Sequence, residues 1–219
     1  PLGSLSEKKV APMQSLVLLA ITAAVIEILA YVLYVRDIGS GRSRPSRASW
    51  LIWAPLAWLT LASQWQAGGE LILVKLTAMC LGVTAVAILA LRFGTGGWSR
   101  LDRLCFLITA LGVVAWIQTR EPVLALLFFI LADMAAAAPT VRDAALHPDK
   151  DSRAAWSASL VAAVLNLAVV PQDQWSASWA GFGIWGFNVY LVLLDGLVVG
   201  LMERGRLRAA LAGAFPAAR

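Results

Sequence analysis

Three acidic residues, Glu27, Asp133 and Asp195, lie within long apolar segments of this 219-residue chain. Each stands nine residues before an arginine. At about 1.5 Å of rise per helical residue, all three would therefore lie at one depth, about 13 Å from the arginine level. Carboxyl groups that deep in a bilayer usually face a cavity or a partner, and their burial and mutual repulsion would favour the protonated forms. The three acids could thus exchange protons, although each could instead lock neighbouring helices together through hydrogen bonds.

Amide and aromatic side chains could complete a solute site at this level. Asn188 lies seven residues, or two helical turns, before Asp195 and so shares its helix face, and Trp185 lies about one turn further out. Further candidates share a polar or aromatic side chain on another apolar segment: Asn166, Trp58, Trp53 and Tyr31. Each of these could equally serve helix packing or face lipid.

The sequence gives little support for nucleophilic catalysis or for a metal site. The single histidine, His147, stands in a charged loop, and no second histidine is present to build a nucleophilic triad. Cys80 and Cys105 lie in apolar runs without the spacing of a metal site. We therefore expect neither an enzyme nor a bound cofactor or metal.

The elements that must position these residues are membrane helices. Hydrophobic residues make up 60% of the chain and charged residues only 14%, which is typical of a membrane protein. A bilayer core about 30 Å thick requires about 20 apolar residues per helix. This window predicts seven transmembrane helices, at about 12–35, 49–67, 70–91, 101–118, 122–141, 154–170 and 179–202. Residues 1–4 resemble the remnant of a cleaved expression tag.

The basic residues predict the orientation of these helices. Of the 18 Lys and Arg residues, 14 lie on the face that carries the first, third and fifth loops and the C-terminus. Because basic residues gather on the cytoplasmic side, we expect the N-terminus outside and the C-terminus in the cytoplasm. Lys75 belongs to the opposite group, and we expect it to extend along its helix to the outer surface. The net charge of +5 then reflects topology, and nucleic acid is not an expected partner.

One sixteen-residue segment occurs twice. VRDIGSGRSRPSRASW from Val35 and VRDAALHPDKDSRAAW from Val141 share seven identical positions at an offset of 106 residues. Both copies fall on the same predicted face, and the same offset superposes Glu27 on Asp133. We therefore expect two parallel three-helix repeats, 5–92 and 121–208, joined by a linker helix within 93–120 and followed by a cytoplasmic tail at 209–219.

This arrangement resembles the SWEET and PQ-loop transporter superfamily, and more specifically a bacterial branch of SWEET-like membrane proteins. The fifth predicted helix ends in Pro139, Thr140, Val141 and Arg142, where that superfamily carries a Pro-Gln pair. The resemblance implies an all-α integral membrane fold of seven helices in a 3+1+3 arrangement. It also implies that acids in comparable helices are proton sites, and that Asn188 lines the solute pocket.

We expect a multi-pass transporter of a bacterial inner membrane that moves a small polar solute by alternating access, with proton coupling. Asn188, Trp185, Trp58, Asn166 and Tyr31 would bind the solute. The alternative is a receptor or assembly factor of the same fold that does not transport. The expected partners are a small-molecule solute and the lipid bilayer, and the sequence is compatible with a homo-oligomer.

The predicted topology can be tested by labelling single cysteines in intact cells. A cysteine introduced at Ser46 or at Ala145 should react with a membrane-impermeant reagent only after the cytoplasmic side is exposed, because both positions lie on the arginine-rich face. Labelling of either position from outside would overturn both the orientation and the repeat assignment.

Overall fold

A computed structural model describes residues 13–97, 100–171 and 174–214. The expected tag remnant at 1–4 and the side chain of Cys105 lie outside the described part. The predicted tail at 209–219 is described as far as Ala214, and this portion continues the last helix.

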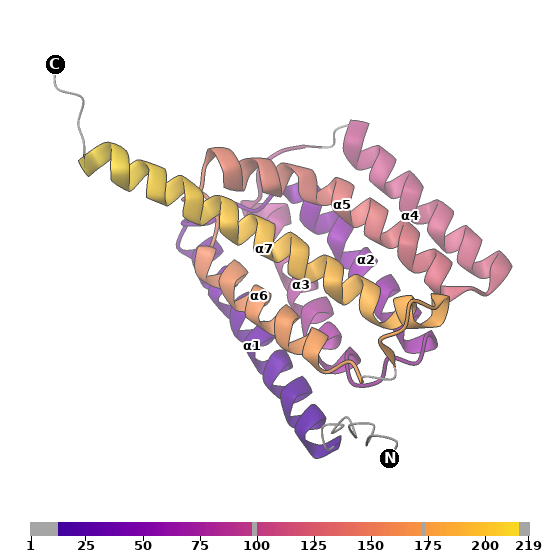
Figure 1. Ribbon diagram of the computed structural model, residues 1–219. Coiled ribbons are helices and arrows are strands. Elements are labelled where there is room, and N and C mark those ends of the chain that lie inside the picture. Colours follow the sequence, from indigo (N-terminus) through magenta and orange to yellow (C-terminus); the bar gives the residue numbers. More distant parts are fainter. Residues whose placement is uncertain (1–12, 98–99, 172–173, 215–219) are drawn as a thin grey trace, which may run out of the picture.

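All seven predicted helices form at the predicted places (Figure 1). Three of them continue four or more residues past the predicted ends into the charged segments, because a helix can continue into water once it has left the apolar layer. The helices are α1 (Met13–Gly39), α2 (Arg47–Gln66), α3 (Leu73–Phe93), α4 (Arg100–Thr119), α5 (Pro122–Leu146), α6 (Arg153–Ala168) and α7 (Trp179–Ala214).

Among the described residues, four helices are long and apolar enough to cross a membrane: α1, α3, α5 and the Trp179–Leu207 portion of α7. Leu107–Thr119 in α4 and the whole of α6 are apolar but shorter. Helix α2 is less apolar because it carries Thr60, Ser63 and Gln64, which are all buried. The protein is thus all-helical in its described part, with several helices suited to a multi-pass membrane protein.

The surface of helix α1 is divided into a buried face and an exposed apolar face. Its buried face consists largely of small residues, including Ala20, Ala23 and Ala30, whereas Leu18 and Val25 are 65% and 56% exposed. Small side chains allow helix backbones to approach closely, and large exposed apolar side chains are compatible with lipid contact. This distribution is the reverse of that in a water-soluble helix, whose exposed face is polar.

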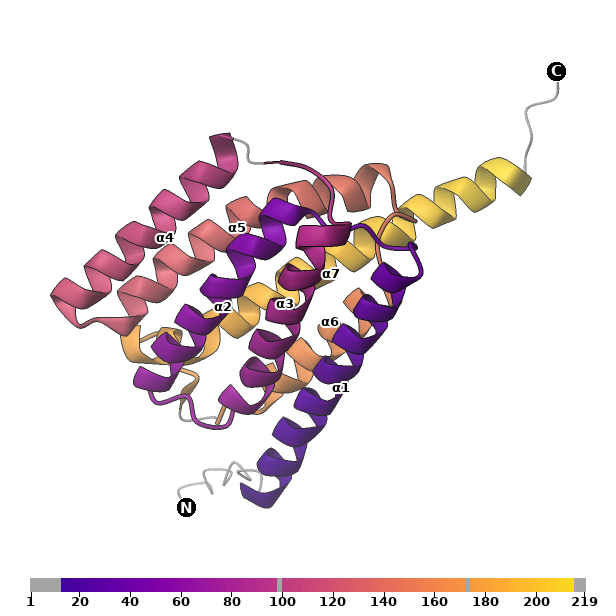
Figure 2. The same cartoon turned by 180° about the vertical axis from the view of Figure 1, so that it is seen from behind.

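Six helices form a closed ring. Going round it, α1 packs on α3, α3 on α2, α2 on α5, α5 on α7, α7 on α6, and α6 again on α1. Helix α4 lies outside this ring and packs mainly against α5. Figure 2 shows α4 at one edge of the molecule and α1 at the opposite edge.

The two copies of the repeated segment meet at one end of the ring. Ser43 Oγ donates a hydrogen bond to Asp151 Oδ1 at 2.7 Å, and Ser152 Oγ donates one to Asp37 Oδ2 at 2.6 Å. These reciprocal bonds join the segment between α1 and α2 to the segment between α5 and α6. Both copies therefore lie on the same side of the molecule.

Close packing at Gly82 gives a test of the contact between α3 and α1. A Cβ atom at Gly82 would lie 2.1 Å from the ring of Tyr31, whereas one at Gly200 would meet nothing within 4 Å. We expect Gly82→Ala to reduce the free energy of unfolding by about 1–3 kcal/mol, the usual cost of overpacking. Gly200→Ala is the matched control and should leave stability unchanged or slightly higher, because alanine favours the helix. Thermal unfolding in detergent micelles measures both, and equal melting temperatures would contradict the packing of α3 against α1.

Candidate functional site

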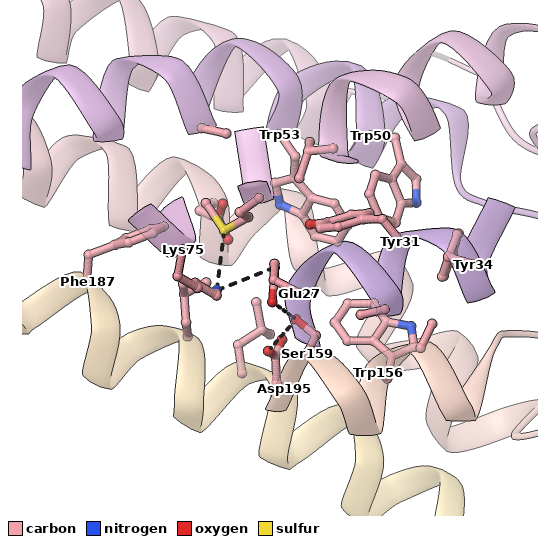
Figure 3. Close-up of a pocket in the computed structure, with 18 residues that line it drawn as sticks. Glu27, Tyr31, Tyr34, Trp50, Trp53, Lys75, Trp156, Ser159, Phe187 and Asp195 are labelled. Carbon is pink, nitrogen blue, oxygen red and sulfur yellow. Dashed lines mark hydrogen bonds and ion pairs between the residues drawn. The ribbon is translucent and has the colours of Figure 1, made fainter. Parts of the chain in front are cut away.

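A cavity of about 80 Å³ lies inside the ring of six helices (Figure 3). Each of these helices contributes at least one side chain to its wall. The cavity has room for several water molecules or a compact solute. Glu27, Asp133 and Asp195, which the sequence predicts to share one site, all line it.

Glu27 is paired with a lysine at this cavity. Lys75 Nζ lies 3.4 Å from Glu27 Oε1, and the two side chains are 1% and 0% exposed. The expectation that Lys75 extends to the outer surface is therefore wrong. Its ammonium group instead points inward from α3 to the carboxylate, because attraction between opposite charges is strong where water is excluded. Met79 Sδ, 3.8 Å from Nζ, provides a further contact (Figure 3).

Ser159 on α6 links two of the three acids. Its Oγ lies 3.1 Å from Asp195 Oδ2 and 3.4 Å from Glu27 Oε2. A hydroxyl group has one proton and can donate to only one carboxylate at a time. Both contacts are satisfied together when one acid is protonated and donates to the serine oxygen. The arrangement can thus hold a proton between α1, α6 and α7.

Asp133 faces the cavity from α5 and is half-buried. It accepts a hydrogen bond from the Tyr190 hydroxyl of α7. Among the residues that the structure describes, no lysine or arginine lies within ion-pair distance of Asp133 or Asp195. These two carboxyl groups therefore differ from Glu27, whose counter-charge is supplied by the protein.

Aromatic rings form the wall near the repeated segments. The Trp50 ring centroid lies 5.0 Å from that of Tyr34 and 5.2 Å from that of Trp53, the latter in an edge-to-face arrangement. Trp156 on α6 and Tyr31 on α1 complete this wall. The rings therefore present faces in more than one direction towards the cavity.

Most of the cavity wall was missed by reasoning from single residues. Among the wall residues not singled out as site members are Tyr34, Trp50, Lys75, Trp156 and Ser159, and Tyr190 lies beside the wall. The sequence did contain a signal for four wall positions: the offset of 106 residues superposes Trp50 on Trp156 and Trp53 on Ser159. Residues related by this offset thus line the same cavity.

Asn188 and Asn166, two of the predicted solute ligands, do not line the cavity. Asn166 Nδ2 donates to Asn188 Oδ1 at 2.8 Å, and Asn188 Nδ2 donates to Ile184 O at 2.9 Å and to Gln64 Oε1 at 3.4 Å. Both asparagines and Gln64 are fully buried. They form an amide cluster, Gln64, Asn166 and Asn188, that joins α2, α6 and α7.

Of the other three predicted ligands, two also lie outside the cavity wall. Trp185 stacks on Trp175 at 6.0 Å between ring centroids, away from the cavity. Trp58 is 43% exposed, and its Nε1 donates to Thr84 Oγ1. Of the five predicted solute ligands, only Tyr31 lies in the cavity wall.

Neither models of known protein families, nor curated proteins, nor solved structures gave a match to this chain. Within the described residues, no group of three or more His, Cys, Asp or Glu side chains could hold a metal ion. The chemistry of the cavity must therefore be argued from its charged, hydroxyl and aromatic groups.

The buried ion pair predicts that removing the charge of Glu27 alone lowers the stability of the protein more than removing both charges. Glu27→Gln leaves the Lys75 ammonium without its counter-charge, so we expect a loss of about 3–5 kcal/mol in the free energy of unfolding. The double variant Glu27→Gln, Lys75→Met should recover most of this loss, because no buried charge remains. Lys150→Met is the control, since the Lys150–Asp143 pair is 35% and 37% exposed and should contribute less than about 1 kcal/mol. Denaturation in mixed micelles measures all three, and a Glu27→Gln variant as stable as the parent would refute the pairing.

Proposed function

We propose that this protein transports a small polar solute across a membrane by alternating access, with proton coupling. The observation that carries the proposal is the cavity itself, in which three acids and one lysine are enclosed by a ring of apolar helices. Ionisable groups are costly in a membrane interior and are usually retained for a solute or ion pathway.

The helix contacts support the division into two three-helix halves with α4 as the linker. In the first half α3 packs on both α1 and α2, and in the second half α7 packs on both α5 and α6. Between the halves α1 packs on α6 and, equivalently, α2 packs on α5. Exchanging α1, α2 and α3 for α5, α6 and α7 leaves these neighbours unchanged. This pattern is what a parallel 3+1+3 repeat requires, and it favours the resemblance to the SWEET and PQ-loop superfamily.

The contacts that close the two ends of the ring also favour alternating access. At one end, Ser43–Asp151 and Ser152–Asp37 join the repeated segments of the two halves. Towards the other end, Gln64 of α2 meets Asn188 of α7. Each closure therefore joins one half to the other, so a relative tilt of the halves would open one end while the other stays shut. In the orientation predicted from the basic residues, the serine–aspartate end would face the cytoplasm.

Proton coupling would use the acids that lack a lysine partner. Asp195 shares the hydroxyl of Ser159 with Glu27, and Asp133 accepts from the Tyr190 hydroxyl. A carboxyl group with only hydroxyl partners can gain or lose a proton without breaking an ion pair. We therefore assign proton exchange to Asp133 and Asp195, and assign to Glu27 the additional task of holding Lys75.

Amide variants of these acids test the proposal in reconstituted vesicles. A panel of small solutes is applied outside, and a trapped pH-sensitive dye reports proton movement. We expect Asp133→Asn or Asp195→Asn to abolish solute-dependent proton movement, because an amide never ionises. The melting temperature should stay the same or rise, since a costly buried ionisable group has been removed. Glu70→Gln on an exposed loop is the matched control and should behave like the parent.

Two outcomes would contradict the proposal. If both variants keep full activity with unchanged pH dependence, the acids serve only to hold helices together. If the unmodified protein binds a solute but moves neither solute nor protons, the receptor alternative replaces transport.

A further inference from the structure

We propose that the cavity recognises a small organic cation that carries no carboxylate, such as a methylated amine. This inference names the solute class for the proposed transport function and rests on it. It follows from three properties of the wall: its charge, its aromatic faces and its lack of an available positive group.

The charge of the cavity wall is unbalanced. Glu27, Asp133 and Asp195 supply three carboxyl groups, whereas Lys75 is the one cationic side chain among the described residues of the wall. Lys75 is already paired with Glu27 at 3.4 Å. Asp133 and Asp195 are left with hydroxyl partners, so each can be neutralised either by a proton or by a cation that enters the cavity.

The aromatic wall suits the same class of solute. Trp50 and Trp53 stand at an interplanar angle of 85°, and Tyr34 lies against Trp50. Trp156 faces the same cavity from α6 (Figure 3). A cation is attracted to the face of an aromatic ring, and rings set at right angles can surround a methylated ammonium group on several sides. The carboxyl groups of Asp133 and Asp195 and these four aromatic residues thus line one small volume.

The wall is poorly suited to the other common solute classes. A carboxylate or phosphate would require a free cationic partner, but Lys75 is neutralised by Glu27 and shares the cavity wall with two further acids. A sugar would require many hydrogen-bonding groups, and besides the charged residues the wall offers the hydroxyls of Ser159, Tyr31 and Tyr34 and indole N–H groups. An amine without a carboxylate meets neither obstacle.

Three related compounds separate these possibilities by equilibrium dialysis against the purified protein in detergent micelles. The first is choline. The second is its uncharged carbon analogue, in which a tert-butyl group replaces the trimethylammonium group. The third is glycine betaine, which has the same ammonium group but adds a carboxylate. We expect choline to bind at least about tenfold more tightly than either of the others, because only choline presents a cation without an anion.

Single substitutions test whether choline binds in the cavity. Asp195→Asn and Asp133→Asn should each weaken choline binding at least about tenfold while leaving the weak binding of the carbon analogue unchanged. Trp53→Leu should also weaken it, whereas Trp58→Leu, at an exposed tryptophan outside the cavity, should have no effect. Circular dichroism and gel filtration check that each variant is folded.

The outcomes also separate this inference from the transport proposal. Absence of choline binding to the unmodified protein, or equal affinity for choline and its carbon analogue, overturns the cation site. Tight choline binding in micelles without choline movement in vesicles would retain the cation site and refute transport. Uptake of neutral solutes with no choline binding would support transport and refute the cation site.

Discussion

A buried charged side chain is costly unless an opposite charge or hydrogen bonds compensate it, and this constraint governs the centre of the molecule. Glu27 and Lys75 meet it by pairing with each other across α1 and α3. The pair is tolerated only because six helices close around it and keep both charges away from the lipid-exposed surface. The alanine-rich face of α1 permits that closure, since small residues let the neighbouring helices approach.

The positions of the helices could be predicted from the sequence because apolar length is a property of each segment alone. The gathering of the three acids could also be predicted, because their common spacing from the arginines fixes depth and the repeat offset relates two of them. The direction of Lys75 could not. A lysine near a helix end can extend outward or turn inward, and only the carboxylate of another helix decides between the two.

The placement of Asn188 shows a second limit of reasoning from spacing. Asn188 and Asp195 do share a helix face, but two turns separate them by about 10 Å along the axis. Over that distance the facing residues change: Ser159 lies opposite Asp195, whereas Asn166 and Gln64 lie opposite Asn188. Periodicity predicts which face of a helix is buried but not which side chains stand across from it. The amides of Gln64, Asn166 and Asn188 bond to one another, and other residues line the cavity.

Positions related by the offset of 106 residues carry different side chains at the cavity, and this difference bears on the proposed function. The offset that relates Glu27 to Asp133 places Gly181 at the position that corresponds to Lys75, so no cation stands at that corresponding position. Glu27 is therefore balanced by the protein, while its counterpart Asp133 is left with a hydroxyl donor and faces the cavity. If both acids served only to hold helices together, equivalent partners would suit both halves equally well. The difference instead leaves Asp133 open to a proton or a solute, which is the division of roles that the proposed transport mechanism requires.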